Sequence, residues 1–366
     1  MAKTTDSICD VRKRTTESKS ELQSIENKQN NDFLVNYQNQ SYNIQKFLRY
    51  HPGGTKILKY FKNRSLEKAF EEFPHSQAAF HLLQDFTLNQ EKYQKYENLI
   101  DWDKAILGQV GSLGHHYWEW VNLPVYRDIK LFKSNILESL TITPWYLIPI
   151  VWIPVSLYFF YNGLARIAAI NTESTLFEPL TSFIFGIFIW TMLEYVLHRE
   201  VFHFKPPDNS KLFITLHFLL HGVHHKAPFD KRRLVFPILP ALLVAKLLLM
   251  IYNVVFPQTI FYFILSGTST GISIKIFIFI DFIININDVS NVKKICLIGY
   301  MFYDLIHYYL HHGAPKFGTY MYLMKRNHNY HHFLHHDLGY GITSKLWDYI
   351  FRTNICLRQL LKPIEW

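Results

Sequence analysis

Ten histidines in four short groups restrict the fold of this chain more than any other feature. The groups comprise His198 and His203; His221, His224 and His225; His307 and His311; and His328, His331 and His332. Neutral imidazole is the commonest metal ligand in proteins. A lone histidine beside an apolar segment is more often a packed residue than a ligand, but four groups with ligand spacing indicate metal binding. Ten ligands exceed the roughly four to six of one transition metal ion, so we expect two ions.

The spacings within the groups predict how they meet an ion. Residues three or four apart share one face of a helix, so each of the last three groups suits one common ion. His198 and His203 are five apart, about 140° around a helix. They converge only if the helix ends between them, and the following Lys205-Pro206-Pro207 fits such an ending.

Residues 32–92 predict a small α+β module after a polar, disordered tail over 1–31. Residues 33–44 read as strand, turn, strand, and a short helix leads into His51-Pro52-Gly53-Gly54. This pattern resembles the cytochrome b5 family, in which the HPGG histidine and a later histidine hold haem b. The resemblance makes His51 and His75 the axial ligands, with His81 as the competing second ligand. His75 is preferred because Pro74 and Ser76 mark a helix start, where the ligands of this family lie. Two histidines fill both axial positions, so such a haem transfers electrons and does not bind oxygen.

Residues 93–143 read as a connector that lies at a membrane interface, because Trp118, Trp120 and Tyr126 alternate with charges. His115 and His116 have no spaced partner and are interpreted as structural. Cys9, Cys296 and Cys356 are far apart and odd in number, so they imply no disulfide framework or zinc knuckle. The N-terminal residues have no apolar core of a signal peptide, so any membrane insertion uses internal segments.

Four apolar runs predict a mainly α, multi-pass membrane protein with a cytosolic, histidine-rich cap that holds two metals. They are 144–165, 180–197, 234–265 and 295–310. Two histidine groups follow the second run, and the other two accompany and follow the last run. If the chain crosses the membrane twice between these two sets, all four groups lie on the same face of the membrane. Residues 266–294 are a low-complexity insertion with Lys275 and Asp281 in its apolar core, and we expect it to leave this parity unchanged.

The net charge of +9 supports the same orientation. Basic residues gather beside the apolar segments, in the loop 198–233 and after residue 311, which is typical of the cytosolic side of a membrane. No basic helix or nucleic-acid-binding motif accompanies the charge, so nucleic acid is not an expected partner.

Two acids precede ligand candidates on the same helical face. Asp304 is three residues before His307, and Glu194 is four before His198. Each is a candidate acceptor for the N–H of a ligand imidazole, which would select the tautomer; for Asp304 the alternative is an interfacial aspartate at a helix start. Four further histidines adjoin the groups and are interpreted as supporting or structural, unless one replaces a named ligand: His217, His312, His335 and His336.

The whole pattern resembles the fatty acid 2-hydroxylase family, in which a cytochrome b5 module is fused to a membrane hydroxylase. The resemblance spans roughly 32–355 and rests on HPGG, on 101–132, and on the histidine motifs at 193–203, 217–241, 303–315 and 327–353. It implies a hydroxylase domain over 144–355, followed by a tail over 356–366. It also implies an endoplasmic reticulum protein that uses O₂ and two electrons to hydroxylate C2 of a long acyl chain, free or on a sphingolipid.

The implied chemistry defines the cofactors and partners. Zinc suits histidine sites but has no redox chemistry, so activity requires a redox metal and we expect di-iron. No flavin or nicotinamide motif is present, so an external NAD(P)H-dependent reductase must supply the haem. Two alternatives are a sterol oxidase or desaturase of the same histidine-rich superfamily, and a metal-binding or metal-transporting membrane protein without catalysis. Transporters place ligands near the bilayer midplane, whereas these lie at the ends of the apolar runs.

Overall fold

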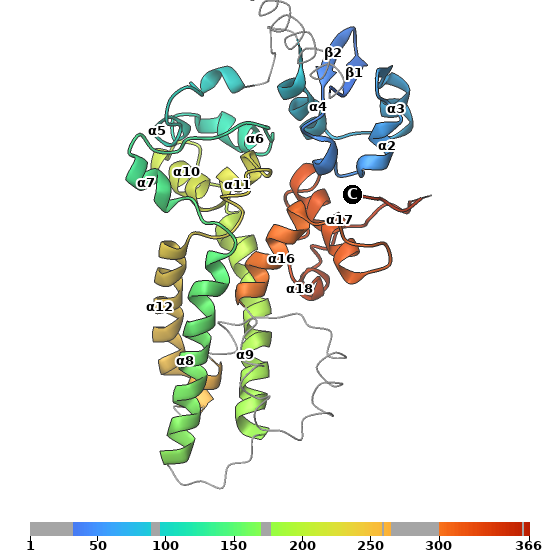
Figure 1. Cartoon of the computed structure of the whole chain (residues 1–366). Helices are drawn as coiled ribbons and strands as arrows, with labels where there is room; N and C mark the ends of the chain where they lie inside the picture. Colours follow the sequence, from blue (N-terminus) through green and yellow to red (C-terminus); the bar gives the residue numbers. More distant parts are fainter. Residues whose placement is uncertain (1–31, 89–95, 170–176, 258–259, 265–299, 361) are drawn as a thin grey trace, which may run out of the picture.

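The computed structural model describes residues 32–88, 96–169, 177–257, 260–264, 300–360 and 362–366. The tail 1–31 and the insertion 266–294 lie outside the described residues. Figure 1 shows a long helical stem, histidine-bearing helices above it, and a small mixed module at the upper end. The predicted fold class, mainly α with a small α+β module, is confirmed at this level.

The small module is built on a hairpin whose short turn is encoded by polar residues. Strands β1 (Leu34–Tyr37) and β2 (Gln40–Asn43) are antiparallel, and β3 (Arg64–Ser65) pairs parallel to β1. Gln38 and Asn39 have φ of 48° and 60°, the conformation that two-residue hairpin turns require. This confirms the predicted strand, turn, strand.

The helices of the module surround this sheet. They are η1 (Leu48–Tyr50), α2 (Thr55–Lys59), α3 (Glu67–Glu72), α4 (Gln77–Leu83) and η2 (Gln84–Phe86). Val35, Tyr42, Leu82 and Phe86 form part of its buried core. Ser76 caps α4 by accepting a hydrogen bond from the N–H of Ala79, so the helix begins where the Pro74–Ser76 pattern predicts.

The predicted interfacial connector, residues 93–143, lies partly in a buried core. It contains η3 (Glu97–Leu99), α5 (Leu107–Val110), η4 (Gly114–His116), α6 (Tyr117–Val121) and α7 (Asn135–Leu140). Trp120 is fully buried and packs with Tyr117 against Ile214 and Phe218. The prediction that Trp120 lies at a membrane interface is therefore wrong. Its apolar neighbours come from distant residues, which a local alternation of aromatic and charged residues cannot indicate.

Three helices among the described residues are long and apolar enough to span a bilayer. These candidate spans, Leu147–Ala165, Leu180–Phe202 and Ile238–Val255, lie on α8 (Leu147–Ala169), α9 (Phe177–Val196) with its extension η5 (Leu197–Phe202), and α12 (Ile238–Val255). Their outward residues are apolar: Leu243 is 72% exposed and Val254 85%. Such a belt would be costly in water and suits lipid.

The remaining helices form the upper layer, and all of them except the last carry histidines. They are α10 (Lys211–His217), η6 (Phe218–Gly222), α11 (Val223–Lys226), α16 (Tyr300–His312), α17 (Tyr320–Phe333) and α18 (Leu346–Ile350). The fourth predicted run begins at 295, outside the described residues. Its described part, α16, packs through Leu305 and Tyr308 on α8 and through Leu310 on Met324 of α17. It therefore connects the stem to the upper layer.

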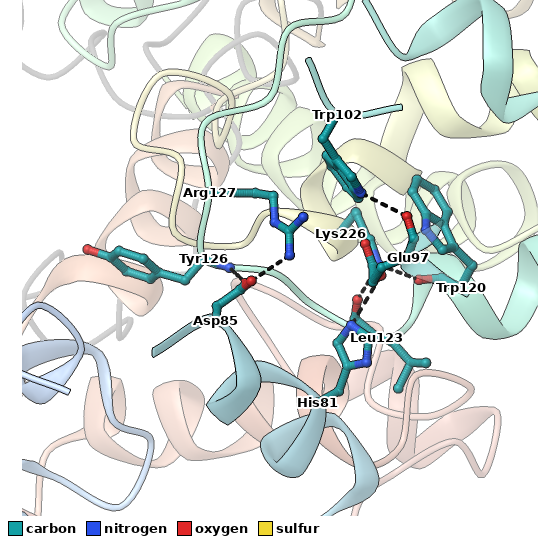
Figure 2. A network of polar contacts seen from close by, with 9 residues as sticks. All are labelled: His81, Asp85, Glu97, Trp102, Trp120, Leu123, Tyr126, Arg127 and Lys226. Carbon is teal, nitrogen blue, oxygen red and sulfur yellow. Dashed lines mark hydrogen bonds and ion pairs between the residues drawn. The ribbon is translucent and has the colours of Figure 1, made fainter. Parts of the chain in front are cut away.

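Two polar side chains of the small module, Asp85 and His81, contact the rest of the chain and help to dock the module on it (Figure 2). Asp85 of η2 accepts hydrogen bonds from Arg127 at 2.5 Å and from the N–H of Tyr126 at 2.6 Å. His81 of α4 meets Glu97, which also binds Lys226 of α11. The Asp85 side chain is 4% exposed, so its charge depends on these partners.

Replacing Asp85 with asparagine should loosen this docking. The amide cannot accept both charged and backbone donors as the carboxylate does, and a hydrogen bond to a charged group contributes about 1.5–3 kcal/mol. We expect faster hydrogen exchange at Tyr126 and Arg127 with the haem spectrum retained. Asp128→Asn is the matched control, because Asp128 is adjacent and exposed. Unchanged exchange in Asp85→Asn would contradict a docking role.

Candidate metal and haem sites

The four histidine groups meet and form two ligand clusters. The first cluster contains His224, His307, His311, His328 and His332, and the second contains His198, His203, His221 and His331. Within each cluster, one ring nitrogen from every member lies within 4.8 Å of the others. The tenth histidine, His225, contacts both: its Nε2 lies 3.1 Å from that of His221, and its ring stacks on His332 with centroids 4.4 Å apart.

The partition differs from the predicted one in two of the four groups. His307 and His311 share a cluster, as i and i+4 positions should. His331 and His332, however, belong to different clusters, and so do His221 and His224. Successive helical residues are about 100° apart, so α17 presents His331 to one side and His332 to the other. The prediction that all members of a group share one ion is wrong for these two groups, because a helix that lies between two clusters can contribute histidines to both.

His198 and His203 converge where the helix ends between them, at Phe202, as predicted, but the last turn is a π-turn that the sequence did not predict. The helix continues as the π-helix η5, and the N–H of His203 bonds the carbonyl of His198 at 3.0 Å. A π-turn bonds residues five apart and so brings them onto one face. The two ring centroids are 4.9 Å apart. A second π-helix, η6, carries His221. Such insertions are frequent at functional sites, but the spacing of histidines alone did not indicate them.

The tautomers of two ligands suit a bound cation. His198 and His331 each donate an Nδ1–H to a backbone carbonyl, of Tyr340 at 2.6 Å and of Leu338 at 2.7 Å. A neutral imidazole that donates from Nδ1 carries a lone pair on Nε2. These Nε2 atoms face those of His221 at 3.2 Å and His203 at 3.0 Å. Convergent lone pairs repel one another unless a cation or a proton lies between them.

Burial keeps the ligands neutral. It lowers the pKa of His221, His224, His328 and His332 well below 6.5, and the neighbouring imidazoles add to the shift. A protonated imidazole cannot ligate a metal, so this environment favours the binding form. The clusters have the donor type, number and protonation state to hold two metal ions.

One loop, residues 338–343, supplies both carbonyls to His198 and His331. Asp348, fully buried, accepts from the N–H groups of Tyr340 and Gly341 at 2.9 and 3.0 Å. Glu194 accepts from the N–H groups of Ile342 and Thr343 and from the Thr343 hydroxyl. The prediction that Glu194 accepts from His198 is therefore wrong, because this carboxylate binds the loop that in turn binds His198.

Asp304 has a different described contact from the one predicted. Its Oδ1 accepts from the N–H of Phe236 at 3.2 Å, where the chain enters α12. A contact with His307 stays a prediction. Asp348 and Thr343 were missed, because their effect passes through the backbone of a loop and leaves no spacing pattern with the histidines.

Asp348→Asn should weaken metal binding at the second cluster. The amide has one acceptor oxygen for three donors, the N–H groups of Tyr340 and Gly341 and the hydroxyl of Thr353, so the loop that orients His198 and His331 loosens. Loss of such supporting contacts typically costs roughly 10–100-fold in metal affinity. Metal retention in a chelator competition measures this. Asp337→Asn, an exposed change in the same loop region, should leave retention unchanged; equal retention in Asp348→Asn would count against the positioning role.

The two predicted haem ligands face each other in the small module. The rings of His51 and His75 are 6.2 Å apart between centroids and inclined by 21°. Imidazole nitrogens bind metals at about 2 Å, so two rings on opposite sides of one ion should lie about this far apart. Each Nδ1 contacts a backbone carbonyl, of Gly54 at 2.9 Å and of Phe73 at 2.5 Å, which leaves Nε2 available. His81, the alternative, faces Glu97 instead.

Six further histidines, described below, belong to neither cluster in the part of the chain that the structure describes. His217 bonds the hydroxyl of Tyr117 at 2.5 Å. His336 contacts the ring of Trp118, and His335 that of Tyr330. The rings of His115 and His116 contact each other at a tilt of 46°. His312 contacts Tyr50 and Tyr308.

An apolar cavity of about 230 Å³ reaches the histidines. His221, His224 and His307 form part of its wall, together with Leu, Val, Phe and Pro residues between α7 and the start of α12. Its one described arginine, Arg233, pairs with Glu138 and with Asp230. The cavity therefore has an apolar wall and an end lined by His221, His224 and His307. Its described lining residues carry no excess positive charge.

Comparisons with known proteins give matches to both parts of the chain. Residues 18–98 match the family described as Cytochrome b5-like Heme/Steroid binding domain. The chain is 35% identical to the Fatty acid 2-hydroxylase of Homo sapiens, over 85% of this chain and 88% of that protein. It is 38% identical to the Dihydroceramide fatty acyl 2-hydroxylase FAH2 of Arabidopsis thaliana, over 69% and 92%.

A solved structure is similar as well. The one described as Full length scs7p (only hydroxylase domain visible) matches with a TM-score of 0.57 and 29% identity, covering 71% of this chain and 88% of that one. A relative at 35% identity is thus matched over most of both lengths. The chain belongs to the fatty acid 2-hydroxylase family.

Proposed function

We propose that this protein hydroxylates C2 of a long acyl chain carried on a sphingolipid, with O₂ as oxidant and electrons delivered through haem b. The observation that carries the proposal is the apolar cavity that ends on His221, His224 and His307. The names of the relatives, which specify fatty acid and dihydroceramide 2-hydroxylation, support it. The reaction converts R–H, O₂, two electrons and two protons into R–OH and water.

The ten histidines are proposed as ligands of two metal ions and His51 and His75 as the axial ligands of the haem. When bound, a redox metal pair supplies the oxidising power that an unactivated C–H bond needs. We expect iron, because zinc fits the same donors but has no redox chemistry. The side chains hold the ligand geometry: Asp348 and Glu194 position the loop, and the loop carbonyls hold Nε2 of His198 and His331 toward the site.

The charge balance of the cavity favours a neutral acyl amide over a free carboxylate. Arg233 contacts two carboxylates, so its charge is already compensated. A fatty acid anion entering this region would lose solvation without gaining an unpaired cation. An amide-linked acyl chain avoids this cost and places its C2 next to a polar, uncharged group.

The protein is further proposed to lie in the endoplasmic reticulum membrane, with both the haem and the histidine clusters in the cytosol. The support is the basic sequence beside the apolar runs and the position of the histidine-bearing helices α11, α16 and α17 toward one end of α8, α9 and α12 (Figure 1). An external NAD(P)H-dependent reductase then has direct access to the haem module.

Expression in cells that lack endogenous 2-hydroxylase activity tests the function. With ¹⁸O₂, we expect sphingolipids whose acyl chains carry one labelled oxygen at C2, measured by mass spectrometry. Labelled sterols or newly desaturated lipids without 2-hydroxy acyl chains would overturn the proposal in favour of another histidine-rich oxidase. Label in free fatty acids before ceramide would overturn the amide substrate alone.

A further inference from the structure

One aromatic contact joins the neighbours of the two proposed cofactor sites. The rings of Tyr50 and His312 lie 5.5 Å apart between centroids, inclined by 76°. Tyr50 directly precedes His51 in the module, and His312 directly follows His311 of the first cluster. Each ring is thus one residue from a proposed ligand of its own site.

The surroundings hold this contact in place. Tyr50 packs on Tyr126 at 6.0 Å and on Phe229 at 5.4 Å, both outside the haem module. His312 packs on Tyr308 one turn earlier in α16, with centroids 5.0 Å apart. Neither ring nitrogen of His312 has a hydrogen-bond partner in the part of the chain that the structure describes. The described contacts of His312 are therefore contacts between rings, and they include the T-shaped contact with Tyr50.

A separate set of contacts binds the HPGG loop to the helix that carries His328, His331 and His332. The carbonyl of Glu365 accepts from the N–H of Thr55 at 2.9 Å, and Trp366 donates to the carbonyl of Pro52 at 3.1 Å. The N–H of Ile364 bonds the hydroxyl of Tyr322 in α17 at 2.8 Å. Together with the Asp85–Arg127 pair, which Figure 2 shows, these contacts attach the module at two places.

The contact lies on the His51 side of the haem site. The described ring neighbours of His75 are Phe70 and His51, all within the module. The His51 side therefore faces the histidine clusters. The Tyr50–His312 pair is a direct ring contact between residues that adjoin the two sites, whereas the ring contacts through Phe47, Phe229 and Phe333 need more steps. The rate of electron tunnelling falls steeply with the distance that must be crossed through space. A ring contact between Tyr50 and His312 shortens that distance between the segment that carries His51 and the segment that carries His311.

We propose that Tyr50 and His312 form the bridge through which electrons pass from the haem to the histidine clusters, within one docked chain. The inference rests on the proposed function. Each transfer oxidises the reduced haem by one electron and reduces the metal centre by one. Two transfers supply the two electrons of a hydroxylation, and no atom moves between the sites.

The test measures how fast the chemically reduced haem is reoxidised in the full-length protein. The protein is mixed with O₂ and ceramide, and the absorption of the haem is recorded over time. We expect Tyr50→Leu to slow this step about tenfold, because the two sites lose a positioned contact, while Tyr50→Phe stays close to wild type. Tyr60→Leu is the matched control, since Tyr60 is an exposed tyrosine of the same module. His307→Ala, with an incomplete cluster, gives the background rate.

Metal content, haem spectrum and hydrogen exchange at Tyr126 and Arg127 are measured on every variant. A slow Tyr50→Leu with all three unchanged supports the bridge. Reoxidation as fast as wild type overturns it, as does an equally slow Tyr50→Phe. A slow variant with increased exchange also overturns it, because undocking is then the cause. If wild type makes no 2-hydroxy product and its reoxidation equals background, the proposed function fails and the bridge with it.

Discussion

His307→Ala abolishes 2-hydroxylated product while the haem absorption spectrum stays that of wild type. His307 belongs to the first cluster, with ring centroids 4.6 Å from His224, 5.1 Å from His311 and 4.8 Å from His328. Its loss leaves four members of that cluster and opens one coordination position to water. We expect product below detection by lipid mass spectrometry, together with reduced metal content.

His51→Ala should give the complementary result. The haem is lost, and metal bound to the histidine clusters remains, because His51 belongs to neither cluster. His335→Ala serves as the matched control within the histidine-rich segment and should retain both cofactors and activity. If His307→Ala kept normal activity, or lost its haem as well, the division into two independent sites would be contradicted.

Lys226→Ala should be the most destabilising single change among the described polar residues of the docking network. Lys226 is fully buried; it donates to Glu97 at 2.5 Å and to the carbonyls of Trp120 and Leu123 at 2.9 and 2.7 Å (Figure 2). Burial lowers the pKa of Lys226 to about 8, and Glu97 opposes that shift, so the ammonium stays charged at neutral pH. Removing one partner of a buried pair costs about 3–5 kcal/mol.

The effect should appear as a lower thermal denaturation midpoint of the protein in detergent. Lys226→Met combined with Glu97→Gln should recover part of it, because no unpaired charge then remains buried. Lys104→Ala is the control, since Lys104 forms its ion pair with Asp101 at the surface and such pairs contribute little. A midpoint of Lys226→Ala equal to that of Lys104→Ala would show that the buried pair does not support docking.

Local patterns predicted the elements of both sites. The alternation at 33–44 led to the hairpin, the Pro-His-Ser sequence to the start of α4, and the i, i+4 spacing to the pairing of His307 with His311. These features depend on residues close in sequence, so the sequence contains the information directly. The reading of Trp120 was wrong for the converse reason, because its burial depends on Phe218 and Ile214 far along the chain.

The sequence by itself determined which side chains are available as ligands, because imidazole chemistry and helical spacing are properties of residues and of short segments. Only the tertiary structure decided how the histidines divide into two clusters. The π-turn at His198, the split of His331 from His332 across α17, and the loop carbonyls held by Asp348 and Glu194 all arise where distant segments pack together. A buried group takes whichever partners the fold brings within hydrogen-bonding distance, and sequence spacing carries no record of that choice.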